Sequence, residues 1–140
     1  MVKIKPYSAS MLALAGLLLI AMGIYFVLLR PPLLPEDLRY MKTTLPLIHD
    51  SAPDLSDWLQ RVFWVMGGYI FTTGLLTIFI SATSFRKRLP GAFGIAAMAG
   101  ITSIGSMTAI NFMIGSDFKW LLLAFTLPWA IALILYRYHK

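Results

Sequence analysis

Residues 8–29 read SASMLALAGLLLIAMGIYFVLL, an apolar run that contains no charged side chain. At about 1.5 Å per residue, a helix of this length crosses a hydrocarbon core of roughly 30 Å. Pro31 and Pro32 follow the run and stop a helix, and no small-x-small cleavage site follows it, which disfavours a cleaved signal peptide. The run therefore predicts a first transmembrane helix.

Three more apolar segments follow, at residues 58–84, 92–114 and 118–137. Of the 140 residues, 59% are hydrophobic and 13% charged, against about 25% charged in soluble proteins. The tight turn at residues 115–117 makes the last two segments antiparallel neighbours. We expect an all-α membrane protein: one domain over residues 1–140, a four-transmembrane-helix antiparallel bundle with a short amphipathic outer helix between spans 1 and 2.

The outer segment, residues 30–57, joins the first two spans. Pro35 fits the first turn of a short amphipathic helix at the membrane surface, and we expect Pro46 to break or kink it. We expect Ser51 to cap a second helix that runs from about residue 52 to about residue 84.

Small residues on the spans predict close helix contacts, because apolar surface gives little drive for association in lipid. The third span carries small residues on more than one face, so we expect it to be the central helix. Its second small face also permits a contact with another copy or another protein.

Basic residues are unequally divided between the two sides of the predicted bundle. One side receives seven basic residues and no acid: Lys3, Lys5, Arg86, Lys87, Arg88, Arg137 and Lys140. The positive-inside rule then places both termini in the cytoplasm and residues 30–57 outside. The expected location is a bacterial inner membrane, with multiple passes. Basic residues at the ends of apolar runs predict topology and contact with membrane lipids rather than nucleic acid binding.

Several kinds of chemistry are disfavoured. The chain has no cysteine, which excludes thiolate catalysis and disulfide exchange. The only histidines are His49 and His139, too few for haem or a zinc site. No span carries an acid or a base near its middle, as proton-coupled transporters usually require. We expect no cofactor, no metal and no enzymatic activity.

The candidate functional residues form two groups. The first is a candidate outer interaction surface, which consists of Glu36, Asp37, Arg39, His49, Asp57, Arg61, Asp117 and Lys119. Within it, we expect Asp117 or Lys119 to pair with the outer segment, and Asp57 to pair with Arg61. We expect Glu36 and Asp37 to act at a helix start. The second group is a set of intramembrane polar contacts, expected mainly between helices: Asn111, Tyr69, Thr73 and Thr77.

Three stretches, PEDLRY at 35–40, GGY at 67–69 and DFKW at 117–120, resemble small four-span bacterial inner-membrane proteins without an assigned activity. The resemblance covers nearly the whole length and implies the four-span topology. It implies no activity and no site residues.

The sequence thus favours a structural or interaction role, as a partner subunit or by self-association. The alternative is a binder or carrier of a small apolar ligand, such as a lipid or quinone, in a pocket between the helices under the outer segment. A third and weaker hypothesis is an enzyme that acts on lipid head groups through the outer acids.

Overall fold

The computed structural model describes residues 7–138, and this part of the chain is helical without strands. Its elements in order are α1 (Tyr7–Leu28), α2 (Pro35–Met41), α3 (Leu45–Ser51), α4 (Leu55–Ile80), the π-helical turn η1 (Ser81–Phe85), α5 (Ala92–Gly100), the π-helical turn η2 (Ile101–Gly105), α6 (Ser106–Met113) and α7 (Lys119–Tyr138). Four helices are long and apolar enough to cross a membrane, confirming the four predicted spans: Tyr7–Leu28, Leu55–Phe85, Ala92–Met113 and Lys119–Tyr138.

α1 and α4 pack at glycines that are seven residues apart on each helix. A Cβ on Gly74 would lie 2.6 Å from the carbonyl oxygen of Gly16, and a Cβ on Gly67 would lie 2.9 Å from that of Gly23. Because the earlier glycine of α1 faces the later glycine of α4, the two helices run in opposite directions. Only residues without a side chain allow their backbones to approach this closely.

α1 is the most buried of the four spans. It packs along α4 on one side and α7 on the other, and its buried residues extend over most of its length: Ser8, Ala9, Leu12, Ala15, Gly16, Leu19, Met22 and Gly23. The prediction that the third span is central is therefore wrong. Small residues permit close packing but do not require it, and Gly94 on the third span has no atom within 4 Å of a Cβ position.

The third span contains a π-helical turn, η2, between α5 and α6. Beside it, the indole Nε1 of Trp129 on α7 donates a buried hydrogen bond of 2.7 Å to the Ala96 carbonyl. A Cβ on Gly100 would lie 2.5 Å from this Nε1, so Gly100 makes room for the indole. The contact joins the third and fourth spans.

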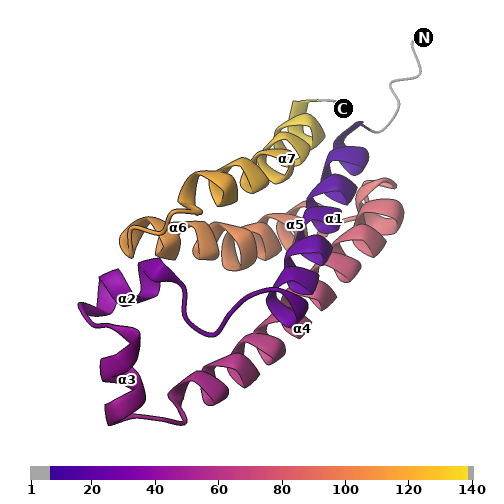
Figure 1. Cartoon of the computed structure of the whole chain (residues 1–140). Helices are drawn as coiled ribbons and strands as arrows, with labels where there is room; N and C mark the ends of the chain where they lie inside the picture. Colours follow the sequence, from indigo (N-terminus) through magenta and orange to yellow (C-terminus); the bar gives the residue numbers. More distant parts are fainter. Residues whose placement is uncertain (1–6, 139–140) are drawn as a thin grey trace.

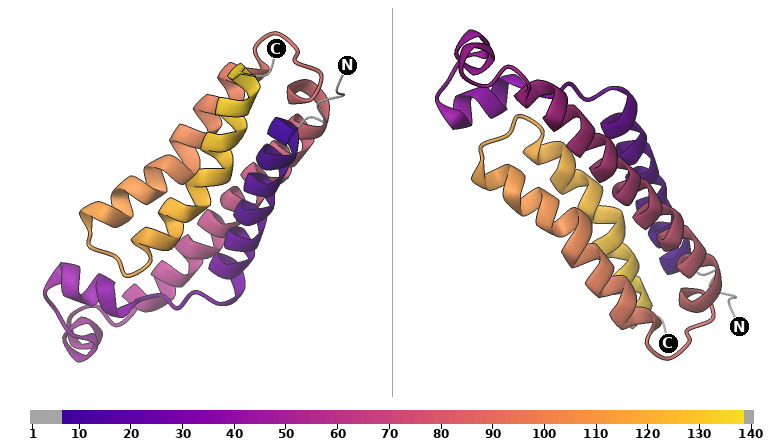
Figure 2. Two further views of the ribbon diagram at one scale, coloured as in Figure 1. Left: turned by 90° about the horizontal axis from the view of Figure 1, so that it is seen from above. Right: turned by 90° about the horizontal axis from the view of Figure 1, so that it is seen from below.

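The two helix pairs lie close together near the chain ends and diverge toward α2 and α3 (Figure 1). At the close end, the Tyr136 ring lies 4.3 Å from the Phe85 ring and 5.6 Å from the Phe93 ring, centroid to centroid. Figure 2 shows α7 alongside the third span, with α2 and α3 beyond the turn that connects the third span to α7. The four spans thus form a wedge that is open toward the outer segment.

The outer segment forms two short helices rather than one. α2 ends at Met41 and is capped by Lys42, which has a left-handed backbone (φ 55°), and Pro46 lies in the first turn of α3. The expected break near Pro46 is therefore present, but it lies at residues 42–44, and Pro46 itself stands in the first turn of the second piece, as its fixed φ allows. Ser51 does not cap the following helix, because its hydroxyl donates to the Leu47 carbonyl at 2.6 Å and α4 begins only at Leu55.

Candidate functional site: a cavity beneath the outer segment

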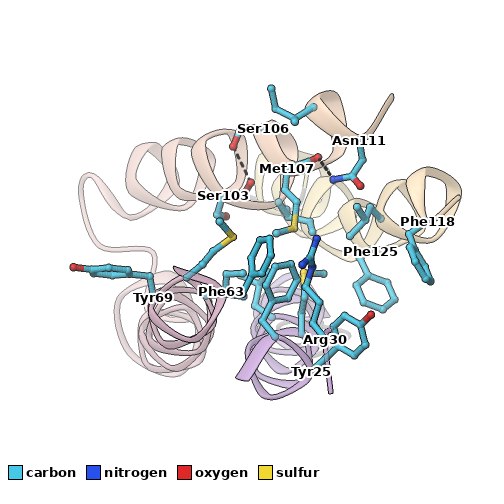
Figure 3. Close-up of a pocket in the computed structure, with 18 of the residues that line it drawn as sticks. Tyr25, Arg30, Phe63, Tyr69, Ser103, Ser106, Met107, Asn111, Phe118 and Phe125 are labelled. Carbon is cyan, nitrogen blue, oxygen red and sulfur yellow. Dashed lines mark hydrogen bonds between the residues drawn. The ribbon is translucent and has the colours of Figure 1, made fainter. Parts of the chain in front are cut away.

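A cavity of about 960 Å³ lies between the diverging helix pairs. This volume is near the upper end of the roughly 300–1,000 Å³ range of small-molecule sites. All four spans and the start of the outer segment line it, with mainly apolar side chains: Leu19, Met22, Phe26, Phe63, Met66, Ile104, Met107, Leu122 and Phe125. Figure 3 shows residues that line this space.

The cavity reaches the sides of the helix set. Its lining includes exposed apolar residues from three spans, with Tyr69 on α4 73% exposed, Ile110 on α6 52% and Leu121 on α7 51%. In a bilayer, these sides would face lipid. A molecule dissolved in the membrane could therefore reach the cavity without passing through water.

Arg30 is the cation of the cavity lining, and it follows directly on the end of α1. Its side chain is only 9% exposed. The guanidinium lies 3.5 Å from the centroid of the Phe63 ring, a cation–π contact. It donates one hydrogen bond of 3.0 Å to the Pro31 carbonyl and another of 3.3 Å to the Asp37 carboxylate. Figure 3 shows the guanidinium among the aromatic side chains of the cavity.

The charge of Arg30 persists despite its burial. Removal from water lowers the pKa of Arg30, and the Asp37 carboxylate opposes this shift by favouring the charged form. The ordinary pKa of an arginine lies far above neutral, so the side chain remains a cation at neutral pH. A fixed positive charge therefore stands at the wide end of an apolar cavity.

Glu36 is an acid that the sequence places at the surface but the fold buries. Its side chain lines the cavity at 4% exposure and accepts a 3.0 Å hydrogen bond from the Ser116 hydroxyl, in the turn between α6 and α7. The same hydroxyl accepts a 3.1 Å hydrogen bond from the Phe118 backbone N–H. Ser116 thus links the outer segment to the start of α7.

α2 crosses the wide end of the wedge, and we call it the strap. Asp37 connects it to the end of α1 through Arg30, while Glu36 connects it to the turn after α6. Arg39 adds an exposed ion pair of 2.8 Å to Asp117, and this carboxylate raises the pKa of Arg39. Three polar contacts therefore tie the strap to both helix pairs.

The structure brings together part of the predicted outer group. The prediction that Asp117 pairs with the outer segment is confirmed by its contact with Arg39. Within residues 7–138, the two ion pairs are Arg30–Asp37 and Arg39–Asp117, so the predicted pair of Asp57 with Arg61 is not formed. The remaining members, His49 and Lys119, join neither ion pair, and no group of metal-binding side chains occurs in this part.

Glu36 and Asp37 have different hydrogen-bond partners at the start of α2. Asp37 accepts a 2.9 Å hydrogen bond from the Leu34 backbone N–H, so the prediction of a helix-start role is correct for this acid. Glu36 also lies in the first turn of α2, as predicted, but its carboxylate accepts the Ser116 hydroxyl and not a backbone N–H of the helix start.

Three of the predicted intramembrane polar residues, Asn111, Tyr69 and Thr73, line the cavity, whereas Thr77 is buried outside it. Their hydrogen bonds do not join different helices. Asn111 donates to the Met107 carbonyl at 2.9 Å, and Thr77 donates to the Thr73 carbonyl at 2.7 Å, both one turn back along their own helix. The expectation of contacts between helices is therefore wrong, because backbone carbonyls one turn away compete as acceptors.

Sequence reasoning missed Arg30 as a site residue, because a basic residue after an apolar run is normally a topology signal at the surface. The proline pair that follows it was the available signal. Pro31 and Pro32 end the first helix just after Arg30, so this arginine stands where the chain leaves the apolar run and enters the outer segment.

The chain matches no protein-family model, no curated protein and no solved structure.

Proposed function

We propose that this protein binds or carries an amphiphilic molecule of the membrane, such as a lipid or quinone, in the cavity under the strap. The observation that carries the proposal is the cavity itself, which is large, mainly apolar and charged only at the end where Arg30, Glu36 and Asp37 lie. Such a division suits a ligand with an apolar body and a polar head. Arg30, Glu36 and Asp37 would face the head, and the side chains between the spans would face the body.

The proposal includes a topology. The four spans would cross a bacterial inner membrane as an antiparallel set within one domain, with both termini in the cytoplasm and residues 30–57 outside. Arg86, Lys87 and Arg88 in the turn after η1 support this orientation, as does Arg137 at the end of α7. The remaining basic residues of the predicted inner side, Lys3, Lys5 and Lys140, lie outside the described residues.

Under this topology the strap separates the cavity from water on the outer side. Its contacts with Arg30 and Ser116 hold it across the wide end. The ligand would enter and leave through the lipid-facing sides, where Tyr69, Ile110 and Leu121 are exposed. The protein's own residues perform no bond-making step in this proposal.

Native mass spectrometry of the full chain, purified in mild detergent, tests the proposal. We expect the protein to retain a lipid or quinone at a fixed stoichiometry. A bare chain with a stoichiometric protein partner would instead support the structural or interaction role predicted from the sequence. An ion bound at the outer face of a bare monomer would favour chemistry at the acids.

A further inference from the structure

Arg30 has more hydrogen-bond donors than its protein contacts use. A guanidinium carries five N–H donors in a planar fork, and Arg30 makes two side-chain hydrogen bonds, to Pro31 and to Asp37. The side chain is 9% exposed and lines the cavity, so water has little access to the remaining donors. A phosphate presents several oxygens in a geometry that matches this fork.

The protein partner of Arg30 holds it only loosely. The distance from Nη2 to the Asp37 carboxylate is 3.3 Å, whereas charge-assisted hydrogen bonds are typically about 2.7–2.9 Å. Asp37 also accepts the Leu34 N–H at 2.9 Å, which fixes the carboxylate at the helix start. A phosphate can therefore share Arg30 with Asp37 without displacing the strap.

The charges of the cavity do not favour an anionic head group. The charged side chains of its lining are Arg30, Glu36 and Asp37, which sum to one negative charge when both acids are ionised. A phosphate alone would add a second negative charge to a site of low dielectric, where an unpaired charge is costly. A head group that carries its own cation would balance the site.

Glu36 is the acceptor for that cation. The Ser116 hydroxyl engages Oε1 of its carboxylate, and a carboxylate has about four acceptor positions in all. A primary ammonium can donate to these positions, whereas a trimethylated one has no N–H to donate.

From these contacts we infer that the cavity takes a zwitterionic phospholipid with a primary ammonium: its phosphate binds Arg30, its ammonium binds Glu36 and its acyl chains lie between the helix pairs. The inference rests on the proposed function and names the ligand class for the same cavity. It also agrees with the lateral route, because such a lipid is already dissolved in the bilayer.

The test is a competition on the purified, delipidated full chain. The protein is incubated with mixed micelles that contain equal amounts of phosphatidylethanolamine, phosphatidylcholine and phosphatidylglycerol, and native mass spectrometry counts the retained lipids. We expect phosphatidylethanolamine to exceed each of the other two by roughly tenfold, the effect of one charge-assisted contact. This comparison needs no variant, so a folding defect cannot obscure it.

Substitutions then assign the preference to residues. Glu36→Gln should bring the ratio of phosphatidylethanolamine to phosphatidylglycerol close to one, and Arg30→Lys should weaken the retention of all three phospholipids. Asp50→Asn is the matched control, because it makes the same change from acid to amide at an exposed position of α3 that lies outside the cavity lining and in neither ion pair. This control should keep the wild-type ratio.

The outcomes separate the two proposals. Equal retention of the three phospholipids by the wild type, or an unchanged ratio in Glu36→Gln, overturns the head-group inference and leaves a lipid-binding cavity standing. Retention of a quinone in place of any phospholipid by the chain as first purified, before delipidation, overturns the head-group inference alone. A wild-type chain that retains no amphiphile at all overturns both proposals.

Discussion

Two adjacent carboxylates at the start of α2 have different partners. Asp37 reaches back three residues to the Leu34 N–H, and this local contact follows from its position in the first turn. Glu36 reaches Ser116, which is 80 residues away in the chain. Local helix-start rules predict the first contact, but no local rule predicts the second, because it depends on how the third and fourth spans are placed.

The Ser116–Glu36 hydrogen bond provides a test at the residue scale. Ser116→Ala leaves a buried carboxylate without this donor, which costs about 1–3 kcal/mol of unfolding free energy. Denaturant unfolding in detergent measures the change. Ser51→Ala is the control, because its exposed hydroxyl bonds only to carbonyls of its own helix. If the two variants lost the same stability, the contact would not contribute to holding the strap.

At the scale of single elements, the apolar runs were sufficient to predict the spans, but their packing was only partly predictable. Glycines seven residues apart on the first and second spans were visible in the sequence, and they do face each other. The third span has at least as many small residues as the first span, yet α1 is the central helix. Composition shows where backbones can approach, whereas the partner and the degree of burial depend on all four spans together.

The α1–α4 contact predicts unequal effects for neighbouring glycines. Gly74→Ala places a Cβ 2.6 Å from the Gly16 carbonyl oxygen, so α4 has to shift. Overpacking of this kind costs about 1–3 kcal/mol. Gly68→Ala meets no atom within 4 Å and should leave stability unchanged or slightly raised. Thermal unfolding of both variants in the same detergent compares them, and a similar loss for both would contradict the close backbone contact.

At the scale of the whole molecule, the wedge could not be predicted from the sequence. The expectation of a bundle assumed that the spans stay in contact along their length, whereas the two pairs diverge and leave the cavity (Figure 1). The strap was expected in outline, as a surface helix that starts at Pro35. Of its attachments, only that of Asp117 was predicted. Glu36 reaches Ser116 and Arg30 stacks on Phe63 of the second span, and both contacts depend on how the spans are placed.

The proposed topology gives a labelling prediction. The chain contains no cysteine, so a single introduced cysteine can be labelled without background. Asp50→Cys should react in intact cells with a thiol reagent that does not cross the inner membrane, because residues 30–57 are proposed to lie outside. Lys87→Cys should react only after the membrane is permeabilised. The reverse pattern would contradict the orientation, although it would leave the cavity unaffected.

The most direct test of the central claim is to fill the cavity and count the retained ligand. Ser103→Phe places a ring in the cavity lining, whereas Ala109→Phe adds the same ring to an exposed position of the same span outside the lining. In native mass spectra of the purified full chain, Ser103→Phe should lose most of the amphiphile that the wild type retains, and Ala109→Phe should keep it. Equal retention by the wild type and both variants would show that bound lipid lies elsewhere on the protein and would contradict the proposed function.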